Sequence, residues 1–463
     1  MVYVSILIAL LFGTAVVVLL TGFVPRKPSE LIYTASIGYG IGIGATSCLL
    51  FIWMVFAGGI TATYFIFEFT IFILVVAIAV SVHRQDPDYK KKSVKKDNGG
   101  KPVLLVFLFY VLLVLAIVGV VLYAKHRPHG SWDAWAIWNV RARYIYRLGG
   151  LWEETFLNDA GMQHIDYPLM LPLAAVRSWS LSGEETVGAP MLIGGMFALS
   201  TLGLLSSSVS MARGINQGYI AGLTLLGTYI FLKYSAKQVA DIPLGLYFLS
   251  GVSIIYLVWQ GVFTTKRFYR LCGLCLGLAI WTKNEGILLA ACVIASSFAM
   301  SIYRGSIKAA CAVVINIMFG LAPIVVVVVY FKLHYAPEND VINYDSLTSS
   351  VIKLVDFGRY IQIAAHFLKT TVTFGPGISV FLLIYYLGVG RDRKLIAEKN
   401  VYFITLSVLL ALIGYFYVYI ITPQELSWHL ETSFSRLLLQ LWPTILLAFF
   451  AYAATPYKWD NTN

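Results

Sequence analysis

The chain has 463 residues, of which 59% are hydrophobic and only 12% are charged. A soluble domain of this length does not need so much apolar surface, so the composition excludes a soluble enzyme or binding module and predicts an all-α polytopic membrane protein. The net charge of +11 is concentrated in alternate loops. By the positive-inside rule these loops are cytoplasmic, and their charge indicates contact with anionic headgroups of the lipid bilayer rather than with nucleic acid.

Apolar runs mark the expected membrane spans. A helix needs roughly 20 residues to cross about 30 Å of hydrocarbon, and about 13 runs meet or approach that length. The eighth and ninth runs are short and share the polar sequence TKNEG. In chain order the runs lie near 2–24, 31–54, 59–82, 102–124, 186–211, 215–233, 241–261, 270–283, 286–302, 309–333, 373–390, 401–422 and 437–455.

The runs divide the chain into a short and a long membrane unit. The first unit, 1–82, holds three runs and a lone acid, Glu68, inside the third. Alternation of the basic loops places the N-terminus outside and the C-terminus in the cytoplasm. The remaining parts are a basic cytoplasmic linker at 83–101, a ten-span unit at 102–455 with large external loops at 125–185, 334–372 and 423–436, and a cytoplasmic tail at 456–463.

The loop after the fourth run carries the densest polar chemistry. Its sequence SWDAWAIWNVRARYIYRL places Asp133 at the head of a segment with helical periodicity, so its carboxylate is a candidate both for a helix cap and for a catalytic group. Trp135 and Trp138 fall on one stripe of this segment, which predicts an amphipathic helix in the headgroup layer. Pro168 and Pro172 predict the entry of a second surface helix.

Further acids lie at other points on the same expected side. His164, Asp166 and Tyr167 precede the second surface helix, and they could hold a metal or share a proton, or be ordinary solvated loop polarity. Asp241 opens the seventh run, in YSAKQVADIPLG, with Pro243 just inside. An acid at the membrane boundary is costly to bury, so Asp241 is expected to snorkel, to cap the helix or to be functional.

The sequence WTKNEGILL interrupts an apolar stretch with Lys283 and Glu285. A polar break at membrane depth normally lines a cavity or contacts protein. The alternative is a hairpin tip held by an internal Lys–Glu pair.

The segment before the last run, QELSWHLETSFSRLLLQLWP, has three polar residues at helical spacing. His429, Ser433 and Arg436 would share one helix face. A guanidinium binds oxyanions through two parallel hydrogen bonds, so this face suits a phosphate. The alternative is interface anchoring by Trp428 and Arg436.

Taken together, these segments resemble the GT-C superfamily of membrane glycosyltransferases, and most nearly its bacterial protein O-mannosyltransferase and aminoarabinose-transferase group. The resemblance covers roughly 102–455 and rests on the order and sidedness of WDAW, DYPLMLP, VADIPLGL, TKNEG and WHLETSFSRLL. Two features depart from the pattern. Three extra spans precede the acidic loop, and His164 and Asp166 stand where many relatives have Lys or Glu.

The resemblance implies a GT-C-like fold in the inner (plasma) membrane with an active site that faces the periplasm or cell exterior. The donor would be a polyprenyl-phosphate sugar and the acceptor a hydroxyl of a cell-envelope glycan, a glycolipid or a protein. Asp133 would be the general base of an inverting transfer, and Arg436, Lys283 and His429 would bind the donor phosphate. A divalent cation, Mg or Mn, would be needed only in some members, with Asp133, Asp166 and Asp241 as its candidate ligands. The acceptor would be bound, or the site shaped, by Arg141, His164, Asp166, Tyr167, Asp241 and Glu285.

Two rival functions remain open from the sequence. The first is a polysaccharide polymerase or ligase that uses a diphosphate-linked donor, which usually offers a large loop with several Arg. The second is a transporter or flippase, which would place polar residues along spans of both halves. Here the polar residues cluster at one surface, and no internal repeat is visible.

Overall fold

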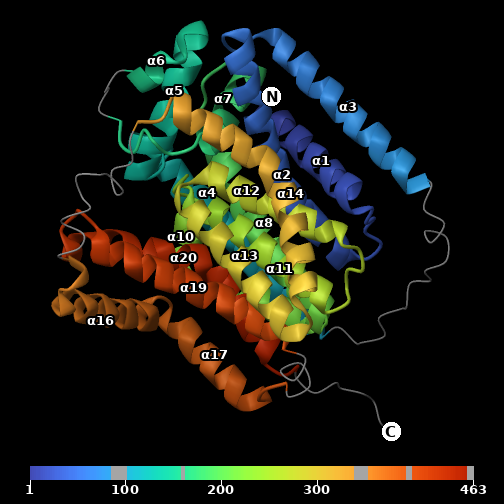
Figure 1. The fold of residues 1–463 in the computed structure, drawn as a ribbon, viewed down its shortest axis with the longest axis vertical. Coiled ribbons are helices and arrows are strands. Elements are labelled where there is room, and N and C mark those ends of the chain that lie inside the picture. Colours follow the sequence, from blue (N-terminus) through green and yellow to red (C-terminus); the bar gives the residue numbers. More distant parts are fainter. Residues whose placement is uncertain (85–101, 158–161, 338–352, 393–398, 456–463) are drawn as a thin grey trace.

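The computed structural model describes residues 1–84, 102–157, 162–337, 353–392 and 399–455, and this part of the chain is helical (Figure 1). Its single β-type pairing is an isolated bridge between Arg391 and Ala453. Ten helices of the described residues are long and apolar enough to cross a membrane, or eleven if one bent pair forms a single span. The chain is therefore a polytopic helical membrane protein, as its composition predicts.

The expected count of about 13 spans is not reached in the described residues, because three of the expected runs fold differently. Gly227 and Thr228 break the run 215–233 into α9 (Ile215–Leu226) and α10 (Tyr229–Ser235). The run 270–283 becomes α12 (Arg267–Thr282), which is only 16 residues long. The run 373–390 becomes α17 (Pro376–Val389), bent by 76° from α16 (Phe357–Thr373) where proline begins the new helix.

Three helices form the N-terminal part: α1 (Val2–Thr21), α2 (Pro28–Ala57) and α3 (Ala62–Arg84). α1 and α2 approach each other closely at Gly42, because this residue has no side chain. A Cβ on Gly42 would lie 1.7 Å from the carbonyl oxygen of Ala9. α3 lies along the outside of the bundle (Figure 1). Glu68 on α3 is buried and forms an ion pair with Arg177, at 2.5 Å.

The core of the longer unit surrounds α11 (Asp241–Trp259), nearly every residue of which is buried. α11 packs against α8 (Gly188–Arg213), α12, α19 (Asn400–Ile421) and α20 (Leu426–Tyr452). α13 (Glu285–Arg304) and α14 (Ile307–His334) complete this group. By contrast, α4 (Val103–His126) buries only Phe109 and Ala124. Because α4 is apolar on all faces, its exposed surface suits lipid.

The segment between α4 and α8 contains the π-turn η2 (Ala134–Trp138), α5 (Asn139–Leu148), η3 (Gly149–Leu151), α6 (Glu154–Leu157) and α7 (Met170–Ser182). The predicted Trp stripe is wrong at its start: Trp135 is exposed and Trp138 buried, because the π-turn has a wider period than an α-helix. α7 is a core helix rather than a second surface helix, since most of its residues are buried. The expected linker lies almost wholly outside the described residues, as does the expected tail.

Candidate functional site

Arg436 joins two acids that are far apart in the sequence. Its Nη2 donates to the carboxylate of Asp133 at 2.5 Å, and its Nε donates to Asp241 at 3.1 Å. Asp241 is fully buried, while the side chains of Asp133 and Arg436 keep 18% and 20% of their surface exposed. The three residues selected from the sequence as base, phosphate ligand and boundary acid therefore converge at one place.

Asp133 is positioned by hydrogen bonds between its loop and the segment before α11. Gln238 accepts from the amide of Asn139 at 2.7 Å and donates to the carbonyl oxygen of Pro128 at 3.0 Å. Gly130 adopts a left-handed φ of 77°, and a Cβ there would lie 2.6 Å from the carbonyl oxygen of Lys237. The capping alternative for Asp133 is wrong, because its backbone is already helical and its side chain makes no cap hydrogen bond.

Asp241 has partners on both carboxylate oxygens, as a buried charge requires. The oxygen not bound by Arg436 accepts from Gln440 at 2.8 Å and lies 3.5 Å from the Nζ of Lys283. Gln440 in turn accepts from the hydroxyl of Tyr415 at 2.8 Å. Gln440 was not among the predicted site residues, although it lies four residues after Arg436 and so extends the polar face of α20.

The TKNEG break contacts other parts of the protein, and it also contains the Lys–Glu pair that the alternative interpretation expected. Lys283 forms the expected internal pair with Glu285, at 2.6 Å, and it also reaches Asp241. The amide of Asn284 donates to Asp166 at 2.6 Å. The break is therefore a buried contact point between α12, α13 and the loop before α7, not a solvated hairpin tip.

Arg141 holds the loop that carries the predicted His164, Asp166 and Tyr167. Its guanidinium donates to the carbonyl oxygens of His164 and Tyr167, at 2.5 and 2.6 Å. Burial lowers the pKa of Arg141 to about 10, although Asp166 and Tyr167 act in the opposite direction. The Tyr167 ring stacks with the rings of both Trp138 and His164. Arg141 thus shapes the loop through backbone contacts, and Asp166 is buried behind it.

His429 and Ser433 lie on α20 with Arg436, as the spacing predicts, but they do not bind its guanidinium. The Nδ1 of His429 lies 2.9 Å from the hydroxyl of Thr422, and Ser433 lies 2.6 Å from the hydroxyl of Tyr419. These contacts link α20 to the end of α19. The neighbours of Arg436 are carboxylates rather than the expected hydroxyl and imidazole groups.

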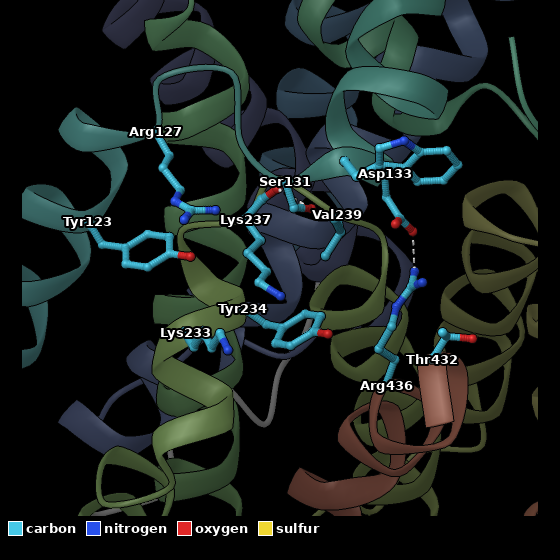
Figure 2. A pocket seen from close by; sticks show the side chains of 11 residues that line it. Tyr123, Arg127, Ser131, Asp133, Lys233, Tyr234, Lys237, Val239, Thr432 and Arg436 are labelled. Atoms are coloured by element: carbon cyan, nitrogen blue, oxygen red, sulfur yellow. Dashed lines mark hydrogen bonds and ion pairs between the residues drawn. The ribbon is translucent and has the colours of Figure 1, made fainter. Parts of the chain in front are cut away.

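A cavity of about 390 Å³ lies beside the Asp133–Arg436 pair (Figure 2). Arg127, Lys233 and Lys237 lie on the opposite side of it from that pair. We call these three residues the cationic wall. They come from the end of α4, from α10 and from the segment before α11. The full lining is Tyr123, Arg127, Ser131, Trp132, Asp133, Lys233, Tyr234, Lys237, Val239, Thr432 and Arg436.

The cationic wall was not predicted from the sequence. Arg127 stands in HRPHG, and Lys233 and Lys237 stand in KYSAKQVADIPLG, where only Asp241 was selected as a candidate site residue. A signal was present, since Tyr123, Tyr229 and Tyr234 each precede a wall residue by three or four positions. Residues so spaced are neighbours on a helix. Each wall cation lies over the ring of one of these tyrosines, at 3.9 to 5.8 Å from its centroid.

The candidate metal ligands do not form a metal centre in the described part of the chain. The guanidinium of Arg436 stands between Asp133 and Asp241, where a cation would have to bind. Asp166 is bound instead by Asn284 and Lys332. No group of three or more His, Cys, Asp or Glu side chains among the described residues has a geometry suited to a metal ion. Dependence on a divalent cation remains a prediction for chelation experiments.

No protein-family model, no curated protein and no solved structure matches this chain.

Proposed function

We propose that this protein is a membrane glycosyltransferase that moves a sugar from a polyprenyl-phosphate-type carrier to an external hydroxyl acceptor. The observation that carries the proposal is the Asp133–Arg436–Asp241 network at the edge of a cavity with a cationic wall. The network offers a carboxylate for proton transfer, and the wall offers positive charge for a phosphate leaving group. α4, which contributes Tyr123 and is followed directly by Arg127, presents an apolar surface along which a lipid tail can lie.

In the proposed reaction Asp133 is the general base. It takes the proton of the acceptor hydroxyl while the acceptor oxygen forms a bond to the anomeric carbon of the sugar. The bond between that carbon and the phosphate oxygen breaks, and its electron pair leaves with the phosphate. Attack from the face opposite the leaving group inverts the anomeric configuration. A positioned base of this kind contributes about 10²- to 10⁴-fold to the rate.

Asp133 is arranged for this role by Arg436. The ion pair occupies one carboxylate oxygen, while the other has no hydrogen-bond partner among the described residues. In this proposal Arg436, held by Asp241, fixes the orientation of the Asp133 carboxylate. Lys283 supports Asp241, and His429 supports the junction of α19 and α20, so both act behind the site rather than on the phosphate.

The proposed location is the outer side of the inner (plasma) membrane, and the proposed acceptor is a cell-envelope glycan, a glycolipid or a protein. A decisive experiment compares envelope glycans and polyprenyl-linked sugars by mass spectrometry in cells with and without this protein. We expect one lipid-linked sugar to accumulate and one glycan modification to disappear when the protein is absent. Unchanged pools of both would refute the transferase proposal.

The base assignment is tested in the same cells. Asp133→Asn should abolish the modification at normal protein levels. Glu184→Gln is the matched control, because Glu184 is an exposed acid in the same segment between α4 and α8. Normal modification in Asp133→Asn cells would exclude Asp133 as the base.

A further inference from the structure

The charge of the cavity is strongly unbalanced. Asp133 is the one carboxylate among its described lining residues, and it is already paired with Arg436. No ion pair joins Arg127, Lys233 or Lys237 to a carboxylate of the described residues. Each lies instead over a tyrosine ring, which attracts a cation without neutralising it. Three positive charges therefore face this space without a counter-ion.

The network behind Asp133 does not supply the missing negative charge. Arg436 and Lys283 are shared among three acids, Asp133, Asp241 and Glu285. That network is compact and carries one excess negative charge, and two of its acids lie behind Arg436 rather than in the cavity lining. The cationic wall is thus free to bind an anionic ligand.

Crowding of the cations is visible at Lys237. Burial, together with the neighbouring charges of Lys233 and Arg436, lowers the pKa of this ammonium to about 8, although Asp133 and Asp241 act in the opposite direction. An anion placed among these groups would relieve the repulsion. The wall therefore gains most from a ligand with more than one negative charge.

We propose that the carrier bound in this cavity is an isoprenoid diphosphate rather than a monophosphate. The inference rests on the proposed function and names its substrate class. A sugar linked through one phosphate carries one negative charge and leaves a carrier with two. A sugar linked through a diphosphate carries two and leaves a carrier with three. Three unpaired cations match the diphosphate, above all after the transfer, when its negative charge is greatest.

The size and the neutral donors of the cavity agree with this ligand. About 390 Å³ falls within the range of small-molecule sites, about 300–1,000 Å³. The hydroxyls of Tyr123 and Tyr234 belong to lining residues and can donate to further phosphate oxygens, whereas the hydroxyl of Ser131 donates to the carbonyl oxygen of Lys237. In the balanced step the bond from the anomeric carbon to the diphosphate oxygen breaks. The diphosphate leaves intact with the electron pair, and the acceptor proton goes to Asp133.

The test is a binding measurement on the purified full-length protein. Farnesyl diphosphate and farnesyl phosphate have the same short isoprenoid tail and differ by one phosphate, so each is titrated calorimetrically into the protein in detergent micelles. We expect the diphosphate to bind about tenfold more tightly, as one additional charge-assisted contact implies. This comparison of the two affinities uses the unmodified protein, so misfolding of a variant cannot affect the result. Equal affinities, or tighter binding of the monophosphate, would overturn the inference.

Variants then locate the site. Arg127→Ala, Lys233→Ala and Lys237→Ala should each reduce the preference for the diphosphate, while Lys125→Ala should leave it unchanged. Lys125 is the matched control because it is an exposed cation on α4 that does not line the cavity. A preference that survives in all three wall variants, or falls equally in Lys125→Ala, would overturn the assignment.

The two proposals fail in different ways. Tight diphosphate binding without any change in envelope glycans would support this anion site and refute the transferase. Glycan transfer with equal affinities for the two probes would support the transferase and refute the diphosphate.

Discussion

Arg436 contacts Asp133 and Asp241 through two different nitrogens of one guanidinium group, so the position of one acid depends on the other. Asp241 is fully buried and anchors this arrangement, while Asp133 faces the cavity. The predicted base is thus held from behind by an acid that the cavity does not reach. This dependence leads to the first two predictions.

Asp241→Asn should destabilise the protein and stop transfer, because it removes the charge that balances Arg436 and Lys283. Removing one partner of a buried ion pair costs about 3–5 kcal/mol. A lower midpoint of thermal unfolding in detergent would measure the loss of stability, and the glycan assay would measure transfer. Asp356→Asn, at the exposed start of α16, is the control and should leave transfer unchanged. Full stability and transfer in Asp241→Asn would show that Asp241 does not anchor the network.

Gln440→Leu tests whether Gln440 is a positioning residue. The change leaves the volume similar but removes the hydrogen bonds to Asp241 and Tyr415. We expect kcat to fall about tenfold with little change in KM, because the ligand would still meet the cationic wall while Arg436 and Asp133 were less well oriented. A purely structural role would lower the amount of folded protein instead and leave kcat per folded molecule unchanged. That second result would show that Gln440 is not a positioning residue.

Glu68→Gln tests how the N-terminal helices are attached. The buried pair between Glu68 and Arg177 joins α3 to α7, and Arg177 also donates to the backbone and hydroxyl of Ser5 on α1. The single change leaves Arg177 buried without its charge partner, so we expect a loss of about 3–5 kcal/mol. Replacing both residues by Leu should cost less than the single change. If thermal unfolding shows the double variant to be the less stable, the pair is not the source of the effect.

The sequence allowed the acids of the network to be selected, because charged residues are rare in this chain and these stand at the ends of apolar runs. It did not allow their partners to be assigned. Arg436 was expected to bind phosphate, but its neighbours come from α11 and from the loop after α4, which only the tertiary fold brings together. The proposed roles of these residues remain predictions.

The cationic wall was missed, and the count of 13 spans is not confirmed, for a related reason. Lys233 and Lys237 look like ordinary interface residues in the sequence, since their significance depends on the absence of nearby acids in three dimensions. The span count relied on apolar composition, which does not report the break at Gly227 or the bend before Pro376. Gly227 and Pro376 indicated these breaks in the sequence, but the spans were assigned from the length of the apolar runs.

The pH dependence of anion binding follows from Lys237. Its pKa of about 8 in the free protein lies below the ordinary value of 10.5, and a bound anion should move it back upward. Binding is therefore coupled to proton uptake, and the affinity should fall as pH rises through about 8, by about tenfold between pH 7 and 9. Inorganic pyrophosphate, titrated calorimetrically at several pH values, measures this slope. Proton uptake itself is read from the dependence of the heat on the ionisation enthalpy of the buffer.

In the absence of an anion, the lowered pKa of Lys237 should make the stability of the folded protein rise with pH, which is the opposite of the trend in affinity. Since the folded state binds this proton less tightly than the unfolded state, the contribution of Lys237 to stability increases as pH rises from about 8 towards 10.5. Lys237→Met should flatten both trends, whereas Lys125→Met should flatten neither. Affinity for pyrophosphate that stays constant from pH 7 to 9 in the unmodified protein would show that Lys237 does not meet the anion. The cationic wall would then be reduced to Arg127 and Lys233, too few charges for a departing diphosphate.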